Sequence, residues 1–283
     1  MRKPTDICLL CDTNQATKEN SHIIPKFIGK SIFGSRGIKR AYLVDTNKGH
    51  EPADFTQGTI KESYLFCPNC ESYLSNIETY IAERFHKRLR TAKLTDQFPL
   101  YENKGGVTWK ICLQVNPIIF RLFIYSIVWR CSISESSIHQ KFKLSSEEDT
   151  LLKSDLKKYI TSTYKEFIEK IETRSENIMI FPFVIYTSQS FHDNAMNTIF
   201  TSSYNKNPYV LHLNEYIVLF SFKTKTFLDN FDFLVNNDIS HIKLGFFSEE
   251  FWLLENKRFF DETVKLTIKT AKAAGHKLYV GPE

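Results

Sequence analysis

Two pairs of cysteines carry the strongest chemical signal in this sequence. Cys8 and Cys11 form one Cys-x-x-Cys pair, and Cys67 and Cys70 form a second one after 55 intervening residues. Two such pairs can place four thiolates around one Zn²⁺ in a tetrahedron. The spacing therefore predicts one structural zinc site; the alternative is two unrelated pairs of buried cysteines.

A histidine and several carboxylates lie close to these cysteines in the sequence. His22 follows the first pair, and Glu71 directly follows Cys70. A neutral imidazole can take a proton from water, and carboxylate oxygens are the ligands that Mg²⁺ prefers. These residue types suit the hydrolysis of a phosphodiester, with a catalytic Mg²⁺ or Mn²⁺ separate from the structural zinc.

The order of these features resembles the HNH (ββα-metal) endonuclease family. In that family, a strand with a histidine, a second strand leading into a knuckle, and a helix follow one another. The matching stretches lie within residues 7–93 and are Cys8/Cys11, His22-Ile23-Ile24-Pro25, Tyr64-Leu65-Phe66-Cys67 and Cys70-Glu71.

The resemblance implies a role for each matched position. His22 would be the general base that activates water, and Glu71 would occupy the metal-ligand position of the helix. The other candidate ligands of the catalytic metal are Glu78, seven residues further along the predicted helix, and Glu19 on the loop before His22.

Two positions depart from the family pattern. Ser21 stands where many members carry Asp or Glu, and Glu71 stands where Asn or His is usual. Two functions therefore stay open: an active endonuclease, or a catalytically degenerate zinc-binding module that binds nucleic acid or a protein partner. Residues 123–130 also resemble a helix of bacterial HNH-like proteins of poorly defined role, which implies a setting in anti-phage defence.

Positive charge is concentrated in the first part of the chain. The net charge is +5, and residues 1–100 carry 15 Lys/Arg against 11 Asp/Glu. This distribution suits a nucleic-acid partner without requiring one. With the HNH-like interpretation, DNA is expected rather than RNA. Basic residues near the end of the predicted helix would contact phosphates or form a solvated face. The nucleic-acid-binding candidates are Lys26, Arg84, Lys87, Arg88, Arg90 and Lys93.

The pattern of elements predicts an α+β chain with two domains. An HNH-like zinc-knuckle domain with a ββα-metal core is expected at 5–95, and an α+β accessory or regulatory domain with an antiparallel sheet at 107–283. The linker is placed at 95–110. The expected helices after residue 67 are 68–94, 116–134, 145–174 and 251–274; the expected strands are 63–66, 178–186, 209–222 and 241–247.

The sequence shows no secretory signal or membrane span, so a cytoplasmic location is expected. The first residues are polar, no run of about 18 apolar residues occurs, and the cysteine usage fits a reducing compartment. We therefore expect no membrane partner. Because a nuclease in a cell needs restraint, a regulatory protein partner or homo-oligomer formation is also expected.

Overall fold

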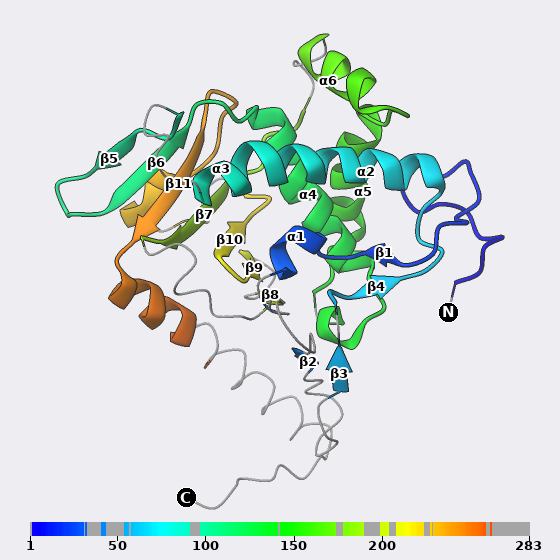
Figure 1. The fold of residues 1–283 in the computed structure, drawn as a ribbon, viewed down its shortest axis with the longest axis horizontal. Coiled ribbons are helices and arrows are strands. Elements are labelled where there is room, and N and C mark those ends of the chain that lie inside the picture. Colours follow the sequence, from blue (N-terminus) through cyan, green and yellow to red (C-terminus); the bar gives the residue numbers. More distant parts are fainter. Residues whose placement is uncertain are drawn as a thin grey trace, which may run out of the picture.

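The computed structural model has an α+β architecture in which one buried helix separates a large sheet from the N-terminal segment (Figure 1). The structure describes residues 2–30, 32, 41–43, 54–56, 58–90, 97–140, 142–173, 178–189, 199–203, 208–223, 227, 229–258 and 261.

The large sheet has seven strands in the order β5-β6-β11-β7-β10-β9-β8. Every neighbouring pair is antiparallel except β11 and β7, which run parallel, so the predicted antiparallel sheet is corrected at this pair. The strands are β5 (Leu100–Glu102), β6 (Thr108–Cys112), β7 (Phe183–Ser188), β8 (Ile199–Ser203), β9 (Tyr209–Leu213), β10 (Tyr216–Phe220) and β11 (Ile242–Phe247).

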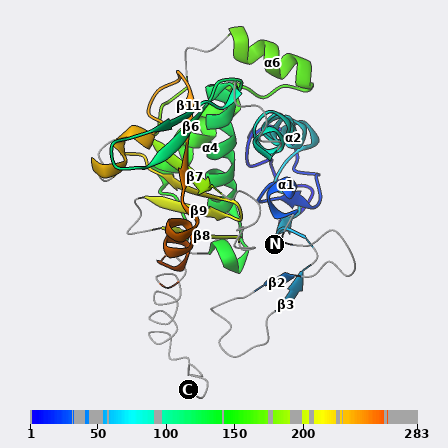
Figure 2. The ribbon, with the colours of Figure 1, turned by 60° about the vertical axis from the view of Figure 1, so that its left-hand side comes forward.

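Helix α4 (Pro117–Ile133) is the central element of the core. Asn116 caps its start by accepting the backbone N–H groups of Ile118 and Ile119, which confirms the predicted buried helix. Almost all of its side chains are buried, because the sheet covers one side and the N-terminal helix α2 (Pro68–Ile81) covers the other (Figure 2).

Side chains alternate across the sheet. On β7, Phe183 and Ile185 join the core that contains α4, whereas Val184 and Tyr186 join a second cluster with Trp252 on the opposite face. Trp252 belongs to a helical segment at 249–258. The predicted helix 251–274 overlaps this segment at 251–258; of its other residues, the structure describes only 261. Both faces of the sheet are thus covered.

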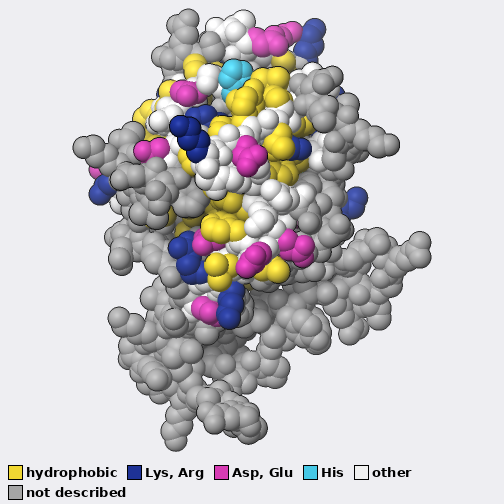
Figure 3. Space-filling view, turned by 90° about the vertical axis from the view of Figure 1, so that its left-hand side faces the viewer, with side chains coloured by type: hydrophobic (Ala, Val, Ile, Leu, Met, Phe, Trp, Pro, Cys, Tyr) yellow, Lys and Arg dark blue, Asp and Glu magenta, His cyan; other side chains and the backbone are white. Residues whose placement is uncertain are grey.

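The side of the molecule that carries β5 and residues 249–258 exposes apolar side chains between charged ones (Figure 3). The exposed large hydrophobic side chains of the protein include Leu100 and Tyr101 on β5 and Leu253 and Leu254 within residues 249–258.

Two predicted segments differ in the structure. The expected linker at 95–110 contains the β5–β6 hairpin, whose turn uses Gly106 in the left-handed region (φ +77°). The expected helix at 145–174 is two helices, α5 (Ser146–Lys158) and α6 (Tyr164–Thr173). A capping box of Ser145 and Glu148 starts the first of them.

The N-terminal segment contains a short antiparallel pair followed by a long helix. Strand β1 (Ser21–His22) pairs with β4 (Lys61–Glu62), so the strand predicted at 63–66 lies two residues earlier. Tyr64 lies within the predicted strand 63–66, and its left-handed φ of 63° is incompatible with a strand there. The remaining elements are α1 (Lys26–Gly29), β2 (Ala41–Leu43), β3 (Asp54–Thr56), the 3-10 turns η3 (Ser137–His139) and η4 (Asp229–Leu234), and the π-helical turn η1 (Ala82–His86) and α3 (Lys87–Arg90), which continue α2.

One hydrophobic core joins both halves of the chain. It contains Leu10 and Ile77 from the N-terminal segment, Phe120 and Ile124 from α4, and Val218 from the sheet. The domain boundaries at 5–95 and 107–283 stay a prediction. Within the described part of the chain, none of the helices combines the length and apolar character that crossing a membrane requires.

Candidate metal centre and the adjoining histidine

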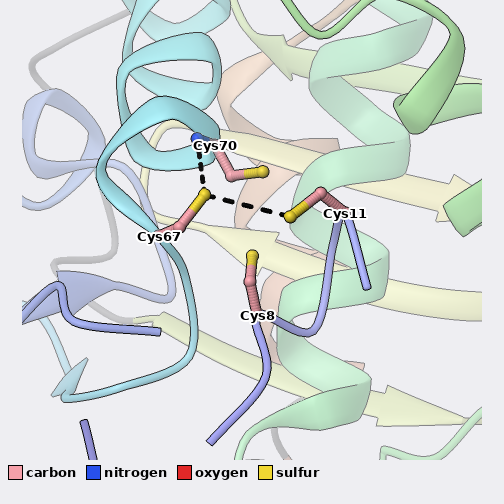
Figure 4. A group of neighbouring side chains, drawn as sticks. All are labelled: Cys8, Cys11, Cys67 and Cys70. Atoms are coloured by element: carbon pink, nitrogen blue, oxygen red, sulfur yellow. Dashed lines mark hydrogen bonds between the residues drawn. The ribbon is translucent and has the colours of Figure 1, made fainter. Parts of the chain in front are cut away.

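The four predicted cysteines lie together. Their Sγ atoms are all within 4.8 Å of one another, and those of Cys11 and Cys67 are 3.9 Å apart. Cys8 and Cys11 come from the N-terminal loop, and Cys67 and Cys70 from the start of α2, with the thiols directed toward one centre (Figure 4). Four thiolates around Zn²⁺ stand about 3.8 Å apart, given Zn–S bonds of about 2.3 Å. The group can therefore bind a metal ion such as zinc.

Local backbone geometry explains why the thiols converge. Cys67 is the N-cap of α2, its Sγ accepts the N–H of Cys70 at 3.5 Å, and Pro68 occupies the first helical position. In the first knuckle, the N–H of Asp12 bonds to the carbonyl of Cys8 at 3.1 Å, with Asp12 in the left-handed region (φ 61°) that Asp tolerates. Both knuckles are turns that leave their cysteines on one side.

The thiols lie close enough to change one another's pKa. A hydrogen bond from Cys70 lowers the pKa of Cys8 to about 4, and the same bond raises the pKa of Cys70. Burial raises the pKa of Cys67. A bound cation would replace the shared proton and hold all four groups as thiolates.

Backbone hydrogen bonds connect the cysteine group to the short strand pair. The N–H of Leu9 donates to the carbonyl of Leu65 at 2.9 Å, and the N–H of Lys18 donates to the carbonyl of Phe66 at 3.1 Å. These bonds fix the loop before β1 against the segment between β4 and α2. The cysteine group and the β1–β4 pair therefore belong to one connected backbone network.

Ser21 and Glu71 contact each other at that junction. The Ser21 side chain is fully buried and its Oγ donates to Oε2 of Glu71 at 2.8 Å. The residue before His22 thus lies next to the residue after Cys70. Because successive strand residues face opposite sides, His22 is directed to the other side of β1 from Ser21.

The half-buried imidazole of His22 lies among positive charges. Its pKa is lowered to about 4, first by burial and then by three cations. These cations are Lys61, Arg130 and Lys26, in descending order of effect. The ring is neutral near pH 7, which is the form that accepts a proton.

Arg130 ties α4 to both β1 and α2. Its Nη1 donates to the His22 carbonyl at 2.8 Å and to Oε1 of Glu78 at 2.6 Å, and its Nε donates to the Ser126 carbonyl at 3.1 Å. The arginine is 2% exposed and the Glu78 side chain 19% exposed. Burial raises the pKa of Glu78, and the Arg130 charge opposes this shift.

The other candidate metal-binding and nucleic-acid-binding residues either contact other side chains or are exposed. Glu19 accepts a hydrogen bond from the Tyr64 hydroxyl at 2.8 Å, and Arg88 donates to Gln97 at 2.7 Å. Lys26, Arg84 and Lys87 are exposed; the side chain of Arg90 and all of Lys93 lie outside the described residues. Arg84 is 13 residues after Glu71, about 20 Å along a helical axis.

Among the described residues, the four cysteines are the only group of three or more His, Cys, Asp or Glu side chains close enough to share a metal ion. Two residues beside His22 were missed at the sequence level. Lys61 is the cross-strand partner of His22, and Arg130 donates a hydrogen bond to the His22 carbonyl.

Searches against protein-family models, curated proteins and solved structures found no match for this chain. A functional assignment consequently depends on the residues and their geometry.

Proposed function

We propose that this chain is a metal-dependent phosphodiesterase of the HNH kind that cuts nucleic acid, with DNA the favoured substrate, around a structural zinc ion. The observation that carries the proposal is the 2.8 Å hydrogen bond between Ser21 and Glu71. It joins the position before His22 to the first turn of the helix after the second knuckle. The family pattern uses these two positions around its catalytic metal, and the order β1, β4, α2 agrees with it.

The reaction is the attack of water on phosphorus. The water oxygen forms the new P–O bond, its proton passes to the neutral imidazole of His22, and the bond to the leaving oxygen breaks. An anionic phosphate beside the ring favours the imidazolium, so substrate binding raises the low pKa of His22 toward a range useful for a base.

Glu71 is the residue best suited to hold the catalytic ion. The carboxylates of Glu78 and Glu19 are bonded to Arg130 and Tyr64, whereas the described contact of Glu71 is to the small hydroxyl of Ser21. Mg²⁺ keeps several waters and uses one or two carboxylates together with substrate phosphate oxygens. Because the His22 side chain leaves β1 on the side opposite to the Ser21–Glu71 contact, one phosphate would have to reach around the edge of β1 that does not pair with β4 to meet both groups. An Mg²⁺ or Mn²⁺ held by Glu71 would then supply stabilisation of the charge on the phosphoryl and leaving oxygens.

Replacing Glu71 by Gln tests this assignment. Gln keeps an oxygen that can accept from Ser21 but removes the negative charge that binds the cation. We expect cleavage at about 1 mM Mg²⁺ to fall at least about tenfold, with partial recovery at higher Mg²⁺ or Mn²⁺. The assay measures the rate of oligonucleotide cleavage as a function of metal concentration, with zinc-loaded protein.

Glu83→Gln is the matched control, because Glu83 is an exposed carboxylate further along the same helical run. It should cut at the wild-type rate with the wild-type metal requirement. An unchanged metal dependence for Glu71→Gln would remove Glu71 from the site.

A second function is a non-catalytic zinc module that binds nucleic acid or a protein partner. The observation that favours it is that the described residues contain no second three-ligand group besides the four cysteines. A zinc-loaded wild-type protein that cuts neither DNA nor RNA with any divalent metal, with or without partners, would support this function. A role in anti-phage defence stays a prediction of the resemblance, and a cytoplasmic location stays a prediction from the composition of the sequence.

A further inference from the structure

The outer face of the β1–β4 pair carries positive charge around the imidazole. In the register of this pair, Ser21 lies opposite Glu62 and His22 lies opposite Lys61. Directly opposed residues share a face, with Cβ atoms about 5 Å apart. Ser21 is buried against Glu71, so the Ser21–Glu62 face is the inner one. His22 and Lys61 therefore share the outer face.

On the inner face, the carboxylate of Glu62 is hydrogen-bonded within the protein. The Glu62 carboxylate accepts the Ser134 hydroxyl and the backbone N–H groups of Glu135 and Ser136, at 3.1 and 3.3 Å for the two N–H groups. These bonds attach β4 to the turn after α4. Glu62 is therefore directed away from Lys61 and does not neutralise it across the strand.

The outer face has an excess of positive charge. Lys61 and Lys26 are both exposed, and both act electrostatically on His22. Within the described part of the chain, neither lysine takes part in an ion pair. Arg130 adds a third positive charge, partly offset by Glu78. An anion bound here would be attracted by all three groups.

We propose that the outer face of β1–β4 binds a backbone phosphate of a nucleic acid, with the ammonium groups of Lys61 and Lys26 on its oxygens and His22 beside it. The choice of a phosphodiester as the ligand rests on the proposed function. A polymer is a better ligand than a single phosphate, because each of its phosphates that contacts a cation releases condensed counterions.

The test measures binding without requiring cleavage. Fluorescein-labelled oligonucleotides, single-stranded and duplex, are titrated with zinc-loaded protein in EDTA-free buffer without Mg²⁺, and anisotropy is followed from about 50 to 200 mM salt. The variants are Lys61→Glu and Lys61→Gln. The matched control is Lys104→Glu, which makes the same charge change at an exposed lysine in the β5–β6 turn.

We expect Lys61→Glu to weaken binding at least about tenfold near 100 mM salt and to reduce the slope of log K against log salt by about one. Lys61→Gln should have an intermediate effect, and Lys104→Glu should stay within about twofold of wild type. Inorganic phosphate at millimolar concentration should compete weakly, since it offers one charged group rather than a chain of them.

Three results would overturn the inference: no binding by the wild type, binding by Lys61→Glu within twofold of wild type, or equal losses for Lys61→Glu and Lys104→Glu. Circular dichroism and zinc content of each variant exclude unfolding as the cause of a loss. Cleavage that depends on His22, with binding that ignores Lys61, would refute this phosphate site and leave the proposed function intact. Binding that depends on Lys61, without any cleavage, would do the reverse.

Discussion

A Cys67→Ser variant is expected to lose its metal and to unfold around the N-terminal segment. Cys67 supplies one of four converging thiols and also caps α2, so its loss opens the metal site and releases the start of the helix. Structural zinc contributes about 10–16 kcal/mol of apparent binding free energy in small zinc domains. That is as large as the whole stability of a typical domain, about 5–15 kcal/mol.

Zinc content and thermal unfolding measure this effect. Wild-type protein should carry about one zinc per chain, and Cys67→Ser well under half an equivalent with a thermal midpoint lower by about 10 °C or more. Cys112→Ala is the control, because Cys112 is a buried free cysteine on β6 outside the group. It should lose some stability and keep its zinc. Less than about half an equivalent of zinc in the wild type would refute the zinc site.

An Arg130→Met variant is expected to show a large loss of stability. Methionine fills similar volume but leaves the Glu78 carboxylate without its counter-charge and the His22 carbonyl without its donor. Removing one partner of a buried ion pair costs about 3–5 kcal/mol. Since Glu78 is 19% exposed, we expect about 3 kcal/mol in the free energy of unfolding, measured in urea.

A double-mutant cycle separates the ion pair from packing. Glu78→Gln in the Arg130→Met background should recover part of the loss, because the unpaired charge is gone. Lys153→Met is the comparison at an exposed pair, where Lys153 bonds Asp12 at 2.6 Å; it should cost less than about 1 kcal/mol. Losses that add without coupling would show that Arg130 and Glu78 stabilise the fold independently.

The sequence predicted those features that depend on residue type and short spacing. Two Cys-x-x-Cys pairs were enough to predict that four thiols meet, since each pair is a local turn. The same holds for α4, where Asn116 and Pro117 mark the start of a long apolar run.

Features that depend on long-range pairing were not predictable in this way. A strand of two residues has too short a pattern to give its register, so the pairing of His22 with Lys61 could not be deduced. The left-handed backbone of Tyr64 moved the second strand away from its β-prone residues. The parallel contact of β7 with β11 joins segments more than 50 residues apart. The residues of one strand carry no pattern that identifies the other as its partner.

The contacts of the candidate residues were not predictable from the sequence. Ser21, the neighbour of His22, contacts Glu71, whereas the His22 side chain is directed to the other side of β1. Glu78, placed on the same helical strip, faces a buried arginine that comes from 52 residues further along the chain. An isolated charge in an apolar helix predicts a partner, but only the packing of α4 against α2 identifies it.

The single-turnover cleavage rate of His22→Ala relative to wild type tests the central claim most directly. Both proteins are compared with one zinc per chain, with the same Mg²⁺ or Mn²⁺, and with protein in excess over a labelled oligonucleotide. General base catalysis contributes about 10²–10⁴-fold, so the variant should cut at least about 100-fold more slowly while binding the oligonucleotide with similar affinity. Equal rates for the two proteins would contradict the assignment of His22 as the base and the proposed function with it.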